Sequence, residues 1–291
     1  MKVLNYGSLN IDNVYSVEHF VRGGETLSSS KMEIFSGGKG LNQSIALSKS
    51  GVEVWHAGAV GESDGKFLLR QLEEAGVNVS LVAHTTGKTG HAIIQRDMEG
   101  QNCILLYGGA NQEITKEQVD QAMSHFEEGD FLVLQNEINE IGYIMEKAHE
   151  KGMKIVLNPS PMDEKIGTYP LEYVDYFLLN EIEAGDICKE NGSGEELIRK
   201  LSQKFPGAKI VLTLGGDGSM YKDGDEILTQ PIYKVPVVDT TAAGDTFTGF
   251  FIGGLMRGEK PEEALDHAAK AAAIAVSRAG AAPSIPDRSE L

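Results

Sequence analysis

The chain has 291 residues, and 43 Asp and Glu against 26 Lys and Arg give it a net charge of −17. Because no basic run offsets this charge, duplex nucleic acid and anionic membrane are excluded as expected partners. The two cysteines lie far apart and no run of about 18 apolar residues occurs, so we expect a soluble cytoplasmic protein without disulfides, a zinc site or a membrane span.

Short apolar segments alternate with amphipathic segments along the chain, which is the pattern of a parallel sheet covered by helices. The expected strands after the N-terminal one lie at 52–60, 131–134, 154–158, 176–180 and 209–214. The expected helices lie at 66–75, 116–128, 195–205 and 261–277, and Gly or Pro follows each of them. We therefore predict a single α/β domain over 1–291, with ligands bound by loops after the strand ends.

Two β-rich pairs interrupt this alternation. Segments 14–20 and 28–35 form the first pair, and segments 91–98 and 102–107 form the second. Because no helix stands within either pair, we predict one small sheet made from about 12–35 and 90–108, which projects as a lid and excludes water from a reaction. Two surface hairpins without a shared role are the alternative.

A glycine-rich segment, GGKGLNQ at 37–43, opens an amphipathic helix. Gly38 permits close backbone approach to a ligand, and Asn42, one turn later, presents an amide to the same side. Asn10 and Asp12 follow the first strand and point to one face, which suits a polyol. Turn formation explains Asn10 and Asp12 equally well. For Gly38 and Asn42 taken alone, a tight turn followed by a solvated first-turn residue is the favoured interpretation.

The segment DTTAAGDTF at 239–247 places an acid among small residues where an apolar helix begins. Small residues at 242–244 let free backbone N–H groups approach an anion. Asp245 would oppose that anion, unless it takes a proton from a hydroxyl that attacks a phosphoryl group held by the same amides. An acid favoured only by the helix dipole is the alternative.

Other signatures are incomplete. The GKT at 87–89 imitates the end of a P-loop, but Val82 stands where its first glycine is required, and no GxGxxG occurs. The GESDG at 61–65 matches the GxSxG nucleophile elbow, so a serine hydrolase using Ser63 stays open. Capping of the next helix by Ser63 or Asp64 is the favoured explanation of that segment.

The two glycine-containing segments together resemble the two signatures of the ribokinase-like (PfkB) family of carbohydrate kinases. GGKGLNQ at 37–43 is similar to the N-terminal signature and DTTAAGDTF at 239–247 to the C-terminal one, with further landmarks at 157–161, 180–183 and 213–218. The resemblance implies a Rossmann-like α/β domain with a β-sheet lid. It also implies an ATP-dependent kinase that phosphorylates a hydroxymethyl group of a furanose-like sugar, with D-ribose as the leading acceptor.

Other outcomes stay open beside that acceptor. A ketose, a deoxy sugar acid or a nucleoside could replace ribose, and a non-catalytic sugar- or nucleotide-binding module could replace the kinase. The RGGE at 22–25 stands where a proline-containing turn is more usual in the family, which leaves the exact sugar open rather than the reaction.

The resemblance assigns expected roles to individual positions. Asp245 would be the catalytic base, with the amides of Ala242, Ala243 and Gly244 as the anion hole. The acceptor would contact Asn10, Asp12, Gly38, Lys39, Asn42 and Glu137. The nucleotide would contact Asn180, Thr213, Gly215 and Gly218. Asn180 and Glu183 would act on Mg²⁺, largely through water, although a capping box explains that pair equally well.

Two further properties are implied by the resemblance alone. The first is activation by K⁺, held by Asp239, Thr241, Ala275, Arg278, Gly280 and Ser284. The second is a homodimer formed through the lid.

Overall fold

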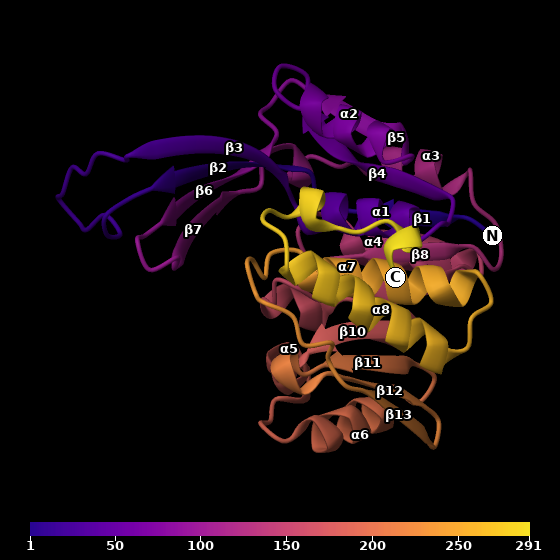
Figure 1. The fold of residues 1–291 in the computed structure, drawn as a ribbon. Coiled ribbons are helices and arrows are strands. Elements are labelled where there is room, and N and C mark those ends of the chain that lie inside the picture. Colours follow the sequence, from indigo (N-terminus) through magenta and orange to yellow (C-terminus); the bar gives the residue numbers. More distant parts are fainter.

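A nine-stranded sheet runs through the middle of the computed structural model, which describes residues 1–291 (Figure 1). Its strand order is β13-β12-β11-β10-β9-β8-β1-β4-β5. The strands are β1 (Val3–Tyr6), β4 (Val54–Gly61), β5 (Asn78–Thr85), β8 (Phe131–Leu134), β9 (Lys154–Leu157), β10 (Tyr176–Asn180), β11 (Lys209–Thr213), β12 (Ser219–Asp223) and β13 (Glu226–Gln230). All pairs from β5 to β11 are parallel, and only β12 and β13 add antiparallel edges.

Helices cover both faces of this sheet, so side chains alternate between two cores. The helices are α1 (Lys39–Lys49), α2 (Lys66–Glu74), α3 (Lys116–Met123), α4 (Ile141–Glu150), α5 (Glu181–Cys188), α6 (Gly194–Lys204), α7 (Ala243–Met256) and α8 (Pro261–Val276). Leu4 packs into the core under α3 to α6, and its neighbour Val3 packs into the core under α1, α2, α7 and α8. The predicted α/β class is confirmed. No helix is long and apolar enough to cross a bilayer.

A second, four-stranded sheet projects from the main body (Figure 1). Its order is β3-β2-β6-β7, from β2 (Asn10–Ser16), β3 (Lys31–Gly37), β6 (Gly90–Arg96) and β7 (Asn102–Tyr107). The two predicted β pairs therefore join in one small sheet, with β2 and β6 parallel at its centre. The first pair lies at 10–16 and 31–37 rather than at 14–20 and 28–35. Beyond Val17 the chain forms a loop, in which His19 Nε2 lies 2.9 Å from Glu25 Oε1.

One predicted helix is too long. The segment expected to be helical to 128 ends at Met123, and the chain then tightens into a turn in which the His125 amide bonds to the Ala122 carbonyl at 3.2 Å. Phe126 in this turn is buried. Phe126, which extended the apolar pattern of the predicted helix, therefore packs into the core from this turn.

Candidate active site

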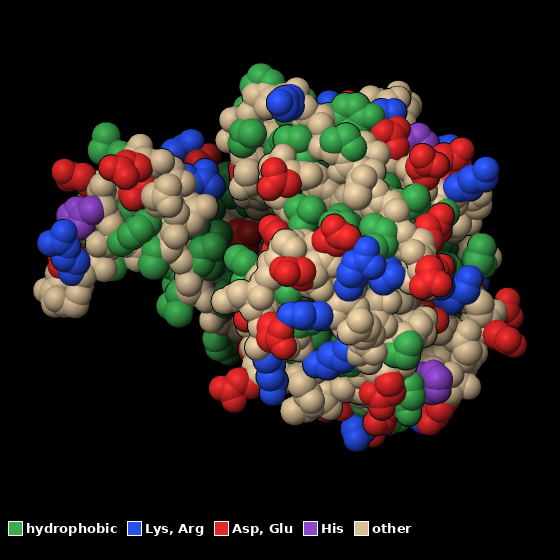
Figure 2. Space-filling model, turned by 90° about the horizontal axis from the view of Figure 1, so that it is seen from below, with side chains coloured by type: hydrophobic (Ala, Val, Ile, Leu, Met, Phe, Trp, Pro, Cys, Tyr) green, Lys and Arg blue, Asp and Glu red, His purple; other side chains and the backbone are tan.

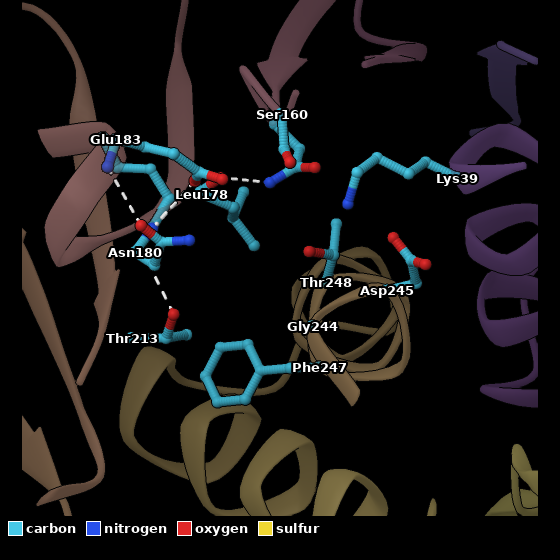
Figure 3. Close-up of a pocket in the computed structure, with 12 residues that line it drawn as sticks. Lys39, Ser160, Leu178, Asn180, Glu183, Thr213, Gly244, Asp245, Phe247 and Thr248 are labelled. Carbon is cyan, nitrogen blue, oxygen red and sulfur yellow. Dashed lines mark hydrogen bonds between the residues drawn. The ribbon is translucent and has the colours of Figure 1, made fainter. Parts of the chain in front are cut away.

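The ends of β9, β10 and β11 and the first turns of α1 and α7 enclose a cavity of about 120 Å³ (Figure 3). Asn180, Glu183 and Thr213 lie on the side of the strand ends. Lys39 and Asp245 lie on the side of the helices. The sequence predicted a site in loops after the strand ends, and these five residues from distant segments do line one cavity.

Asp245 lies in the first turn of α7 with only 6 % of its surface exposed. Both of its carboxylate oxygens accept hydrogen bonds from α1, Oδ2 from Asn42 Nδ2 at 3.1 Å and Oδ1 from Gln43 Nε2 at 2.9 Å. Gly249 permits the contact of the two helices, because an added Cβ there would lie 2.4 Å from Ala46 Cβ. Two donors stabilise a buried carboxylate in its charged form.

Asn42 has an additional feature. Its Oδ1 is buried and has no hydrogen-bond partner in the protein. A buried acceptor without a partner is costly, so this atom is available to a donor from a bound molecule.

The N-terminus of α7 exposes backbone donors beside Asp245. Ala242 precedes the helix with a left-handed backbone (φ 60, ψ 9), and the Thr246 amide is the first to bond back into the helix, at 2.8 Å from the Ala242 carbonyl. The amides of Ala242, Gly244 and Asp245 have no acceptor in the protein, whereas the Ala243 amide bonds to the Thr240 carbonyl at 3.3 Å. The free donors thus differ from the predicted trio, since Ala243 is engaged and Asp245 is open.

The predicted acceptor residues come from three places. Asn10 and Asp12 share one face of β2, Gly38 and Asn42 begin α1, and Glu137 follows β8. Figure 2 shows a hollow between the projecting sheet and the main body, with acidic side chains in it. The contacts of Gly37 with Asp12, of Gly38 with the Asn10 amide and of the Lys39 amide with Glu137 bring these residues together where the two sheets join.

Two glycines make this junction close. Gly37 lies against β2, where an added Cβ would lie 2.1 Å from Asp12 Oδ2. Gly38 has φ 95, a backbone that side chains rarely adopt, and an added Cβ would lie 2.9 Å from the Ser8 carbonyl oxygen. The glycines accordingly allow the start of α1 to pack against the strand that carries Asp12.

Glu137 binds the N-terminus of α1. Its Oε2 accepts hydrogen bonds from the Lys39 amide at 2.9 Å and from the Ser8 hydroxyl. The helix dipole favours a negative charge at this position. Burial raises the pKa of Asp12 to about 6, and the charge of Glu137 contributes to the same shift.

Lys39 sends its side chain into the cavity beside Asp245 (Figure 3). Burial alone would lower the pKa of this amine, but the charges of Asp245, Glu137 and Glu183 outweigh it, so the pKa of Lys39 is raised. The cavity therefore contains one permanently cationic group among carboxylates.

Asn180 and Glu183 form the capping box that their spacing allows. The Asn180 amide donates to Glu183 Oε2 at 3.0 Å, and Asn180 Oδ1 accepts from the Glu183 amide at 2.9 Å. Glu183 is nonetheless buried, and its Oε1 has no partner. The pair both begins α5 and leaves a carboxylate oxygen for the cavity.

The glycines predicted on the nucleotide side lie in one turn after β11. Gly215 and Gly218 have φ 54 and φ 100, and a Cβ on Gly218 would lie 2.2 Å from the Gln230 carbonyl oxygen. Thr213 ends β11 at the wall of the cavity.

The loop at 239–241 lies beside the loop that follows α8. Asp239 Oδ1 accepts from the Thr241 amide at 2.9 Å, and its Oδ2 accepts from the Gly280 amide at 3.1 Å. Ala275 is buried near the end of α8, and Ser284 is buried with its hydroxyl donating to the Ala281 carbonyl at 2.7 Å. Arg278, in contrast, pairs its guanidinium with Glu290 at 2.5 Å.

Ser63 does not form a hydrolase site. Its hydroxyl lies 3.4 Å from the Lys88 amine, and no histidine bonds to it. His267, a candidate base, pairs with Glu259 at 2.9 Å. The constellation of nucleophile and base that a serine hydrolase requires is absent.

The capping that was expected at this helix is also wrong. Neither Ser63 nor Asp64 caps α2, whose N-cap position is Gly65 without a side-chain bond. Asp64 instead accepts from the Thr89 hydroxyl at 2.6 Å and from the Thr89 amide at 3.1 Å. Its carboxylate connects the loop after β4 to the residue before β6.

Sequence reasoning missed several polar residues around the site. Gln43 stands next to Asn42 in the glycine-rich segment, and this position is the one sequence feature that could have identified it as a site residue. Asn111 donates from Nδ2 to Asn10 Oδ1 at 2.8 Å, and Asn158 lines the cavity at the end of β9. Nothing in the local pattern around Asn111 indicates its contact with Asn10.

Comparisons with known proteins agree with this geometry. A model described as pfkB family carbohydrate kinase matches residues 1–288. The ribokinase of Staphylococcus aureus is 35% identical over 295 residues, covering 98% of this chain and 96% of that protein. The ribokinase of Bacillus subtilis is 32% identical over 291 residues, covering 98% and 96%. The solved structure of Arabidopsis thaliana ribokinase complexed with ribose and ATP is similar, with a TM-score of 0.89 at 29% identity, covering 99% of this chain and 96% of that one.

Proposed function

Because this chain belongs to the pfkB family of carbohydrate kinases, we propose that it transfers the γ-phosphoryl group of ATP to the hydroxymethyl oxygen of D-ribose, in the cytoplasm. The full-length relatives named above are ribokinases, and the solved relative from Arabidopsis thaliana binds ribose and ATP. The observation that carries the proposal is the buried carboxylate of Asp245, bonded by Asn42 and Gln43 and adjacent to free backbone amides.

The chemistry follows from the positions of these groups. Asp245 accepts the proton of the sugar hydroxyl as its oxygen attacks the γ-phosphorus, the O–P bond forms, and the bond from γ-phosphorus to the ADP oxygen breaks. The amides of Gly244 and Asp245 and the amine of Lys39 stabilise the charge on the transferring group. A proton acceptor and fixed positive dipoles in one cavity are what this transfer needs.

The acceptor site lies between the two sheets. Asn10, Asp12 and Asn42 offer amide and carboxylate groups to sugar hydroxyls, and Gly38 lets the start of α1 pack against Ser8 beside them. Glu137 holds the start of α1 in place beside them. The projecting sheet acts as a lid that keeps water away from the phosphoryl group.

The nucleotide side fits a divalent cation. Glu183 keeps a carboxylate oxygen without a partner at the cavity, and Asn180 adds an amide, which are ligands that Mg²⁺ accepts directly or through water. Mg²⁺ supplies charge neutralisation for the phosphates. Thr213, Gly215 and Gly218 form the surface against which the nucleotide binds.

We also propose activation by K⁺ near Asp239. The contact of the 239–241 loop with Gly280 brings a carboxylate and the carbonyl-rich segment after α8 together, and oxygen ligands of this kind suit a hard cation. Arg278 would contribute its backbone carbonyl, since its side chain is paired with Glu290.

A homodimer through the lid accounts for its exposed apolar surface. On the face of the small sheet opposite Asp12, Ile34, Leu105 and Tyr107 are 57%, 68% and 56% exposed. Hydrophobic side chains gather on this projecting sheet in Figure 2. Apolar patches of this kind mark interfaces. Leu105→Lys should lower the mass measured by analytical ultracentrifugation from dimer to monomer, and an unchanged mass would reject this interface.

The proposed reaction is tested by ADP release with ATP and Mg²⁺. Ribose, 2-deoxyribose, fructose and nucleosides are compared, each with K⁺ or Na⁺. Ribose should give the highest kcat/KM, and K⁺ should raise it. Activity with another acceptor but not with ribose would reject the sugar, and no ADP release with any acceptor would reject the kinase.

A further inference from the structure

A chain of buried polar side chains leads from Asp245 into the core. Gln43 donates from Nε2 to Asp245 Oδ1 at 2.9 Å. Gln135, which follows β8, donates from its Nε2 to Gln43 Oε1 at 2.7 Å and to Asn5 Oδ1 at 2.9 Å. Asn5 and Gln43 are 0% exposed and Gln135 is 1% exposed. Groups this deeply buried keep the orientation that their hydrogen bonds dictate.

A backbone carbonyl determines the direction of every bond in this chain. Asn5 Nδ2 lies 2.7 Å from the Gly40 carbonyl, which can only accept, so the Asn5 amide has a single orientation. Its Oδ1 therefore faces Gln135, which must donate. The second N–H of Gln135 meets Gln43 Oε1, and Gln43 is left with its nitrogen toward Asp245.

Gln135 has one unsatisfied atom, because its Oε1 is buried without a partner. This oxygen lies against Gly7, where an added Cβ would be 2.3 Å from it and 2.6 Å from Gly40 Cα. An apolar side chain of similar size would remove that acceptor, but it would leave two others, Asn5 Oδ1 and Gln43 Oε1, without a donor. The part of Gln135 that matters is therefore Nε2, which donates to both of these acceptors.

We propose that Gln135 is a positioning residue for phosphoryl transfer, acting through Gln43 on Asp245. Together with Asn158, whose Oδ1 accepts from Gln43 Nε2 at 3.3 Å, it keeps the Gln43 amide from turning its oxygen toward the carboxylate, where two oxygens would repel each other. The bond that Gln43 then donates favours the charged, proton-accepting form of Asp245. This inference rests on the proposed function, because it assigns a role in the same reaction.

Gln135→Met tests it, since methionine has a similar length and no donor. We expect kcat for ADP release to fall by about 10- to 100-fold, the range for loss of a hydrogen bond to a charged group. KM for ribose and for ATP should change little. The acid side of the kcat–pH profile should move to higher pH, because the carboxylate loses a donor while Lys39, the charged group that faces it from α1, is unchanged. A merely structural residue would not shift that profile.

Ser44→Ala is the matched control. Ser44 is also 0% exposed and accepts from Asn5 Nδ2 at 2.8 Å, but Asn5 keeps its orientation through the Gly40 carbonyl when that bond is lost. This variant should lose stability and keep the wild-type pH profile. Gln135→Glu is a second variant at the tested position. A neutral carboxylic acid there has one donor for two acceptors, so an intermediate kcat is expected.

A double-variant cycle completes the test. Gln43→Met should lower kcat by about as much as Gln135→Met, and combining them should cause no additional loss, because both act through one bond. Additive losses, or a wild-type pH profile in folded Gln135→Met, would overturn the positioning role. Wild-type protein that releases no ADP with any sugar would instead reject the proposed function.

Discussion

Glu137 lies close enough to Asp12 for its negative charge to add to the effect of burial, and together they raise the pKa of Asp12 to about 6. The acceptor site therefore contains a carboxyl group that titrates just below neutral pH. This relationship separates the pH dependence of sugar binding from that of the chemical step, which depends on Asp245.

We expect KM for ribose to rise as the pH falls through 6. Above that pH Asp12 is charged and accepts strong hydrogen bonds from hydroxyls, and below it the protonated group is a weaker, neutral acceptor. Between pH 7 and pH 5 the rise should be about tenfold, as for one group with this pKa. Steady-state kinetics at saturating ATP measure it. In Asp12→Asn, KM should be high and independent of pH over the same range.

The same substitution should make the protein more stable at neutral pH. The pKa of Asp12 is higher in the folded protein than in the unfolded chain, so its ionisation above pH 6 favours unfolding. Asp12→Asn should accordingly raise Tm at pH 7.5. The gain should disappear as the pH falls to about 3, below the pKa of 3.8 of an unperturbed Asp, because Asp12 is then protonated in both the folded and the unfolded chain. Thermal denaturation at the two pH values would contradict this if the gain were the same at both.

Asp245→Asn should lower kcat by about 10²- to 10⁴-fold, the usual contribution of a general base. The amide cannot accept from both Asn42 and Gln43, and it cannot take the hydroxyl proton. Nucleotide binding should persist, because Thr213 and Gly218 are untouched. ADP release and calorimetric ATP binding measure the two effects, and turnover at the wild-type rate would exclude Asp245 as the base.

Gly249→Ala should destabilise the contact between α1 and α7. An added Cβ would lie 2.4 Å from Ala46 Cβ and 2.7 Å from backbone atoms of α1. We expect the free energy of unfolding in urea to fall by about 1–3 kcal/mol, as for an overpacked core. Gly207→Ala is the control, because its added Cβ meets nothing within 4 Å. Equal effects of the two substitutions would be inconsistent with the close helix contact.

Ser63→Ala should leave ADP release unchanged. The serine hydroxyl has only a long contact with Lys88 and takes no part in the cavity. Labelling of the wild-type protein by a phosphonate probe at Ser63 would revive the hydrolase alternative.

The fold was predictable where local pattern and tertiary structure agree. The predicted bounds of β8 and β10 are correct, because both faces of these strands are buried and each strand is a continuous apolar run. The strand β5 was missed, since only one of its eight residues is buried and its apolar run, at 81–83, is short. Helix α3 was extended wrongly because Phe126 continues the apolar pattern from a turn.

The site was predictable where its residues lie in the two signature segments. Asp245 and Asn42 could be identified in this way, as could Gly38. The bond from Gln43 to Asp245 joins positions 202 residues apart and depends on how α1 packs on α7, which no local pattern encodes. The role of Gln135 depends on the direction of an amide, and that direction is set by the Gly40 carbonyl. Residue type alone reveals neither how two helices pack nor which way an amide points.

The strand order also governs when the active site can first exist during synthesis. β1 is flanked by β4 and β8, so it lacks one neighbour until residue 134 has left the ribosome. The helix α1 must wait longer, until α7 is made and can cover it. Because nascent chains emerge from the N-terminus, Gln43 is made 202 residues before the carboxylate that it binds. Phosphotransfer is thus a property that a growing chain acquires only after α7 has been made.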